Sequence, residues 1–214
     1  MKKISLIILL MLSSFCFLCA CKEEKEQDFH RVVYSLSENG EYYICKGVWS
    51  FDGFTDSDKH ELIIEAYICG KPVLEIANNA FHFGHMKRLV IPDTVERIGD
   101  YAFEYCSELE EIVFSNNLKS IGKYAFNKCE NIKKIELPNS VTSLSDYCFI
   151  YATSLKEFYI PNSVVNIGNS ILKYSNNTEI KVYCESDKKL STWHENCFNG
   201  LSEGSIIYNY KNSV

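Results

Sequence analysis

Apolar residues recur at a fixed interval through the middle of the chain. A shift of 23 positions aligns the block Ile98-Gly99-x-x-Ala102-Phe103-x-x-Cys106-x-x-Leu109 with further copies of itself. The copies are Ile121-Gly122-x-x-Ala125-Phe126-x-x-Cys129-x-x-Ile132, Leu144-Ser145-x-x-Cys148-Phe149-x-x-Ala152-x-x-Leu155 and the shorter form Ile167-Gly168-x-x-Ile171-Leu172. A further short form, Ile76-Ala77-x-x-Ala80-Phe81, is displaced by 22 positions. A period of this length is typical of leucine-rich repeats and is too short for repeats made of helix pairs.

Short apolar runs between these blocks alternate with period two, which predicts one short parallel strand per coil. The runs are Leu89-Val90-Ile91-Pro92, Ile112-Val113-Phe114-Ser115, Ile135-Glu136-Leu137-Pro138 and Phe158-Tyr159-Ile160-Pro161. One coil cannot bury its apolar side alone, so neighbouring coils must stack around a continuous core. The return from each strand is expected to be irregular or a short helix. The predicted fold class is therefore an α/β repeat solenoid.

Two columns of repeated residues are expected inside the stack. The phenylalanine of each Ala-Phe pair predicts a ladder of aromatic rings; its members are Phe81, Phe103, Phe126 and Phe149. Cys106 and Cys129 share another position, which Ala152 fills in the next copy. This favours small buried side chains over reactive thiols.

Both ends of a solenoid need a cap, because otherwise the core meets water. Residues 31–61 are assigned to the amino-terminal cap, where Asn39-Gly40 predicts a hairpin within 34–45 that continues through 47–50; the polar segment 51–59 is expected to be a loop. The repeats are assigned to 62–183, with a strand at 180–183. Residues 184–214 form the predicted carboxy-terminal cap, with a short helix over 189–198 and a strand at 206–208.

The first twenty-one residues read as a secretion signal. Lys2 and Lys3 precede an apolar segment that Ser13 and Ser14 interrupt, which is short for a membrane-spanning helix. An uncleaved amino-terminal anchor is the alternative. Leu18-Cys19-Ala20-Cys21 resembles the bacterial lipobox, and this resemblance implies cleavage after 1–20 and lipid attachment at Cys21.

The segment 21–30 is expected to be a charged tether between the lipid and the folded part. Its Lys22-Glu23-Glu24-Lys25 run resembles the signal that sends lipoproteins of Bacteroidetes-type bacteria to the outer face of the outer membrane. That resemblance implies a surface-exposed protein. The tether itself indicates only a solvated spacer.

The charge of the chain argues against one class of partner. The formal net charge is −6, and loss of Lys2 and Lys3 with the leader makes the mature protein more negative still. Such a surface repels nucleic acid. No cofactor is predicted.

No catalytic set stands out among the chemically reactive residues. The catalytic and phosphate-binding motifs tested (Gly-x-Ser-x-Gly, His-Glu-x-x-His and a glycine-rich phosphate loop) are absent from the sequence. His82-x-x-His85 has a spacing that suits a metal on a helix, but no further ligand completes a site, and we expect solvated side chains. Cys45 could pair with Cys69, and Cys184 with Cys197, because secretion permits disulfides. The alternative for each cysteine is a free thiol.

The pattern Ile-Pro-x-x-Val-x-x-Ile-Gly-x-x-Ala-Phe resembles the BspA-type, or treponemal-type, leucine-rich repeat of bacterial surface proteins. The lead-in over 70–76 also fits. The departures are Phe114-Ser115 in place of Ile-Pro, Ser145 in place of Gly and the worn copy after Ile167. The resemblance implies a non-catalytic adhesion protein that binds a protein or glycan partner.

The strand face that points away from the core is the predicted partner-binding surface. Its outward positions are Arg88, Val90, Glu111, Val113, Lys134, Glu136, Glu157 and Tyr159. Their mixed charge and apolar content suit a protein partner better than a phosphate ligand. A structural spacer or a subunit of an envelope assembly is the second hypothesis, and a small hydrolase is the third.

Overall fold

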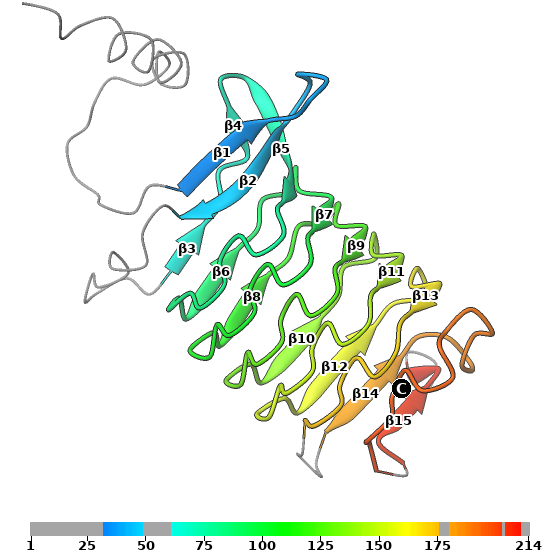
Figure 1. The fold of residues 1–214 in the computed structure, drawn as a ribbon. Helices are drawn as coiled ribbons and strands as arrows, with labels where there is room; N and C mark the ends of the chain where they lie inside the picture. The colour runs from blue at the N-terminus through cyan, green and yellow to red at the C-terminus, as the bar shows by residue number, and fades with distance from the viewer. Residues whose placement is uncertain (1–31, 49–60, 176–179, 203, 211–214) are drawn as a thin grey trace, which may run out of the picture.

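The chain winds into a solenoid of stacked coils (Figure 1). The computed structural model describes residues 32–48, 61–175, 180–202 and 204–210. The leader, Cys21, the tether and the predicted loop at 51–59 lie outside the described residues. Within the described part, no helix is long and apolar enough to cross a bilayer.

Each full coil has three sides, two made of strands and one made of turns. The strand side holds β3 (Glu61–Ile63), β6 (Arg88–Val90), β8 (Glu111–Val113), β10 (Lys134–Glu136), β12 (Glu157–Ile160), β14 (Lys181–Cys184) and β15 (Ile206–Tyr208). The short-strand side holds β5 (Lys71–Ile76), β7 (Arg97–Ile98), β9 (Ser120–Ile121), β11 (Ser143–Leu144) and β13 (Asn166–Ile167). The turn side consists of residues 99–109 and their equivalents in the other coils. The parallel strands expected from the alternating runs are confirmed, and so are the strands near 180–183 and 206–208.

The sequence predicts one strand per coil, whereas the structure has two. The additional strands contain the Ile or Leu that opens each repeated block, such as Ile98 and Ile121, which pair in parallel. Except for β5, they are only two residues long, too short to leave an alternating pattern in the sequence. The Ile or Leu of each is buried, so this side also closes the core.

The return segments are turns, and the described residues contain no α-helix. The helix expected over 189–198 is therefore wrong. This segment forms a further coil instead, because Ser170 and Ile171 donate their N–H groups to the carbonyls of Asn196 and Cys197. Cys197-Phe198 thus occupies the place of the Ala-Phe pair.

The predicted hairpin lies at the amino-terminal end of the stack. It consists of β1 (Val32–Leu36) and β2 (Tyr43–Val48), which pair antiparallel, and β4 (Tyr67–Ile68) pairs antiparallel with β5. β2 also pairs in parallel with β5, so the hairpin extends the short-strand sheet. Its role as a cap remains a prediction.

A column of phenylalanine rings fills the core. Phe81, Phe103, Phe126 and Phe149 are all buried, and neighbouring ring centroids lie 5.2–5.3 Å apart. The planes differ by no more than 8°, so the rings stack face to face with an offset. The spacing follows from the coils, because stacked strands lie about 4.8 Å apart.

The strand side is divided into two sheets, although the short-strand side is continuous. One sheet contains β3, β6 and β8, and the other contains β10, β12, β14 and β15. The division coincides with Phe114, which replaces a smaller aliphatic residue directly after β8. Its ring meets Phe126 edge-on with centroids 6.0 Å apart.

Candidate functional site

The predicted partner-binding residues lie on the strand side in two parallel columns. The ionic column carries charges of alternating sign from coil to coil. Its members are Glu61, Arg88, Glu111, Lys134, Glu157 and Lys181. The hydrophobic column lies two residues further along each strand. Its members are Ile63, Val90, Val113, Glu136, Tyr159 and Tyr183.

Four of the six charges of the ionic column form ion pairs. Arg88 pairs with Glu61 on one side and, through Nε at 3.1 Å, with Glu111 on the other. The Lys134 ammonium lies 3.1 Å from Glu136 in the neighbouring column, and this hydrogen bond raises the pKa of Lys134. Exposed pairs of this kind add little to stability. The other two charges have hydrogen-bond partners only: Glu157 accepts the Tyr159 hydroxyl, and the Lys181 ammonium donates to the carbonyl of Gly204.

The first half of the hydrophobic column is aliphatic. Ile63 is 61% exposed and Val113 is 36% exposed, and Val90 lies between them in register. These β-branched side chains favour strands, but that preference does not require them to face water. Together they form a short apolar row beside the ion pairs.

The second half of the hydrophobic column is aromatic. The rings of Tyr159 and Tyr183 stack with centroids 4.6 Å apart, and Tyr210 meets both at 5.6 and 5.7 Å with steep interplanar angles. The Lys134 ammonium lies 4.9 Å from the centre of the Tyr159 ring, within cation–π range. Partial burial, and then the Glu157 charge, raise the pKa of Tyr159.

The sequence pattern missed Glu61 and Lys181 of the ionic column and three apolar or aromatic members of this surface. Ile63 and Tyr183 occupy the same register in the coils before and after the four runs, so extending the period by one coil each way finds them. Tyr210 follows the last strand and carries no repeat signal.

A shallow cavity of about 420 Å³ opens at the corner between the two strand-bearing sides. It is lined by Ala66, Tyr67, Leu74, Asp93, Thr94, Glu96 and Asn117. Asp93 accepts the N–H and the side-chain amide of Asn116, and these bonds lower the pKa of its carboxyl group. The two carboxylates of the lining are thus partly engaged within the fold.

The histidines of the His82-x-x-His85 motif each face a glutamate of the next coil. His82 Nε2 lies 3.4 Å from Glu104, and His85 Nδ1 lies 3.0 Å from Glu108. The described residues hold no group of three or more potential metal ligands.

The seven cysteines in the described part are free thiols. Cys106 and Cys129 are fully buried and lie 3.2 and 3.3 Å from carbonyl oxygens of earlier coils, within S–H hydrogen-bonding range. Burial and the neighbouring Cys106 raise the pKa of Cys129 well above its ordinary value, so this thiol is a poor nucleophile.

The four cysteines considered for disulfides differ in exposure. Cys45 is buried, whereas Cys69 is exposed. Cys184 and Cys197 are both buried, and burial, followed by the effect of Cys197, raises the pKa of Cys184 to about 12. The two pairings remain predictions.

Solved structures share this architecture. A leucine-rich repeat protein of Treponema pallidum is 26% identical, with a TM-score of 0.65 over 76% of this chain and 71% of that one. One from Bacteroides ovatus is 25% identical, with a TM-score of 0.62 over 73% of this chain and 40% of that one.

A third structure is described as a leucine-rich cell surface protein of Faecalibacterium prausnitzii. It has a TM-score of 0.60 at 19% identity, over 87% of this chain and 56% of that one, and this likeness shows the fold alone. This chain thus spans less than two thirds of the Bacteroides and Faecalibacterium proteins. No curated protein matches the sequence.

The family comparison agrees with the fold and with the repeated block. The model of the BspA-type leucine-rich repeat region matches residues 74–204 in six copies, which extends the repeats beyond the predicted limit at 183. The sixth copy accounts for the coil found over 189–198. Leucine-rich repeat proteins are generally binding or surface proteins without catalytic activity. The chain belongs to the BspA-type leucine-rich repeat family.

Proposed function

We propose that this protein is a non-catalytic binding module of the bacterial cell envelope and that it recognises a protein partner through its strand side. The observation that carries the proposal is the hydrophobic column, which exposes aliphatic and aromatic side chains beside a column of paired charges. The centres of protein interfaces are poor in charge and rich in aromatic residues. Because most of the adjacent charges already form ion pairs, a partner that covers the hydrophobic column removes water from few unpaired ions.

The stack also suits this role mechanically. Its strands hold the outward side chains at a fixed spacing, so little backbone freedom remains to be lost on binding. Tyr159, Tyr183 and Tyr210 are already packed against one another. Rigid tyrosines of this kind give large contact areas at a low entropic cost.

Truncating the aliphatic row should weaken partner capture. Full burial of a valine or isoleucine side chain is worth about 1.5–3 kcal/mol. The double variant Ile63→Ser/Val113→Ser should therefore lower affinity by about tenfold or more. The measurement is cross-linking of the purified protein to whole neighbouring or host cells, followed by quantitative mass spectrometry of the captured proteins.

Val165→Ser provides the matched control. Val165 is also β-branched and is 44% exposed, but it lies just before β13 on the short-strand side. Capture should survive this change. Capture that also survives replacement of every outward residue of the strand side would show that the partner binds elsewhere.

We also propose that Cys21 carries the lipid that holds the module at the outer membrane. The lipobox resemblance supports this assignment, and several acyl chains give stable anchoring where one alone is marginal. Cys21→Ser should move the protein from the membrane fraction to the soluble fraction, as fractionation would show. Protease treatment of intact cells tests the surface location, and a protected wild-type protein would contradict it.

A further inference from the structure

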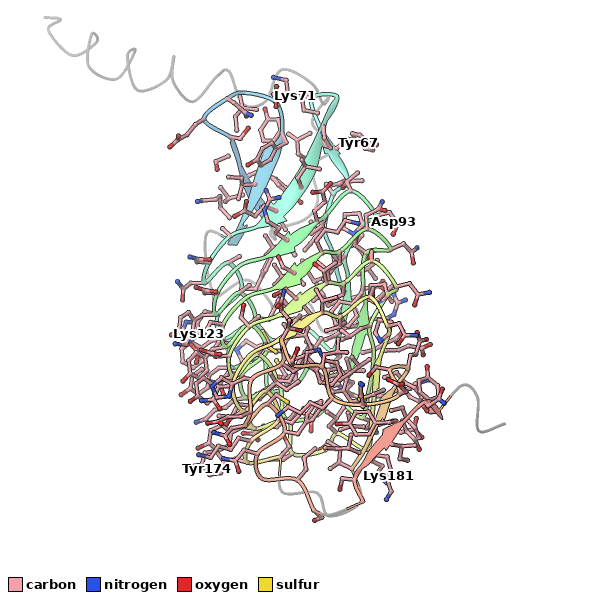
Figure 2. The ribbon with its side chains drawn as sticks, turned by 90° about the vertical axis from the view of Figure 1, so that its right-hand side faces the viewer. Tyr67, Lys71, Asp93, Lys123, Tyr174 and Lys181 are labelled. Carbon is pink, nitrogen blue, oxygen red and sulfur yellow. The ribbon has the colours of Figure 1, made fainter. Side chains whose placement is uncertain are left out.

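The turn side carries two columns of mostly aromatic residues that neither the core nor the proposed partner site uses; Phe83 and Tyr174 are exposed, and the other rings are partly exposed. In the first column, Tyr101, Tyr124 and Tyr147 stack with centroids 5.2 and 4.9 Å apart. The second column, four residues further along, contains Phe83, Tyr105, Lys128, Tyr151 and Tyr174. Figure 2 shows Lys123 and Tyr174 projecting from this side, away from Lys181 on the strand side.

The backbone at these positions does not call for aromatic residues. Every member of both columns has a positive φ, between 55° and 63°. This geometry lets alternate N–H groups point along the stack; for example, Tyr101 and Tyr105 donate to the carbonyls of Lys123 and Asn127 in the next coil. Glycine or asparagine adopts the left-handed region most easily, and other residues lose roughly 1–2 kcal/mol there. The chain nevertheless places tyrosine at most of these positions.

The rings differ in kind between the inside and the outside of the stack. The buried column uses phenylalanine in all four coils, whereas the turn side uses tyrosine at six of the eight positions of its two columns. Stacking alone is satisfied by phenylalanine, so the hydroxyl groups are an added feature. Tyr147 accepts a hydrogen bond from Asn169, and the hydroxyls of the other five tyrosines make no hydrogen bond within the described residues.

The charged residues beside the first column alternate in sign from coil to coil, so this part of the turn side carries little net charge. Asp100, Lys123 and Asp146 occupy equivalent positions in successive coils. Asp100 and Asp146 each accept a backbone N–H of the next coil, at 2.7 and 2.8 Å. The Lys128 ammonium lies between two rings, 4.6 Å from the centre of Tyr105 and 5.5 Å from that of Tyr151. A neutral ligand fits such a surface better than a strongly charged one.

The shape of the turn side favours one class of ligand. In the first column the rings cover one another's faces, so this side presents mainly ring edges and hydroxyls rather than a pocket for an apolar anchor. The tyrosines of this column repeat over three successive coils, about 5 Å apart. A periodic, polar-edged surface matches a polymer whose own units repeat on that scale and carry hydroxyls.

From these observations we propose that the turn side binds an extended, neutral, β-linked polysaccharide laid along the stack. One sugar unit lies against each coil. The tyrosine hydroxyls hydrogen-bond to sugar hydroxyls, and the aromatic edges contact sugar C–H groups. The site is separate from the strand side and does not depend on the partner-binding proposal.

Calorimetric titration of the mature protein with cellohexaose and chitohexaose tests this assignment. Binding of at least one hexamer is expected, and it should tighten from the dimer to the hexamer as further coils are engaged. The triple variant Tyr101→Phe/Tyr124→Phe/Tyr147→Phe keeps the stacked rings and removes only the hydroxyls. It should weaken binding by about tenfold, because each lost hydroxyl removes a hydrogen bond of modest net strength.

The matched control is Tyr159→Phe/Tyr183→Phe, which removes two hydroxyls from the stacked pair on the strand side. This variant should bind the oligosaccharide as the wild type does. Failure of both hexamers to bind would overturn the assignment, and so would equal loss of binding in the two variants. Capture of a protein partner is measured separately, so failure of one proposal leaves the other to be judged alone.

Discussion

Replacing Gly47 with alanine should separate the amino-terminal hairpin from the first coil. Gly47 lies on β2 with φ of 101°, and a Cβ atom added to it would stand 1.6 Å from the carbonyl oxygen of Ala80. Backbone atoms on both sides of this contact leave no flexible group that could move aside. The overlap and the left-handed backbone together should cost about 3 kcal/mol or more. Thermal unfolding should show a fall in Tm of roughly 6–12 °C.

Gly70→Ala separates the overlap from the backbone effect. Gly70 has φ of 77°, and an added Cβ would meet no atom within 4 Å. Its replacement should cost only the strain of the left-handed region, roughly 1–2 kcal/mol. Equal losses in the two variants would show that the hairpin can shift away from the coil. In that case the close approach at Gly47 does not hold it in place.

Replacing Phe126 with alanine should open a hole in the middle of the core. The Phe126 ring lies between Phe103 and Phe149 at 5.2 Å on each side and meets Phe114 edge-on. Loss of a buried phenylalanine side chain costs about 3–5 kcal/mol. The free energy of unfolding, measured by urea titration, should fall by that amount. The solenoid can close the hole only by moving whole coils, because each coil packs against its two neighbours.

Phe83→Ala is the matched control for this loss. Phe83 is 52% exposed and belongs to the outer column, where it stacks on Tyr105 at 4.7 Å. Its removal should cost about 1.5 kcal/mol at most, the worth of one aromatic pair. A loss as large as that of Phe126→Ala would mean that the outer rings also carry the stability of the stack.

The sequence predicted those features that recur with the full period. Ile135, flanked by Lys134 and Glu136, alternates in burial as a strand with one buried face requires. The Ala-Phe pair marks the same place in each coil, and the structure stacks the four phenylalanine rings there. The family assignment rests on the same repetition, which survives local departures because several copies report it independently.

Other features were hidden because the local residue preferences point elsewhere. Tyrosine rarely adopts a left-handed backbone conformation, so the sequence does not predict a positive φ at Tyr101 or Tyr124. The sequence predicts a helix over 189–198 and not a further coil, because Trp193-His194 stands where the other coils have Ile-Gly. Trp193 is buried there, and its indole N–H donates to the carbonyl of Val164. The ionic and hydrophobic columns depend on the register between neighbouring strands. The sequence of a single coil does not show that register.

The two-part strand side gives the solenoid an uneven stiffness along its length. Between most neighbouring coils, backbone hydrogen bonds join the stack on all three sides. At the level between β8 and β10 the ladder on the strand side is missing, while the short-strand side and the turn side remain joined. We therefore expect bending to concentrate at this level and to open toward the strand side. Bending between β8 and β10 changes the angle between the aliphatic half and the aromatic half of the hydrophobic column, while the packing within each half stays the same.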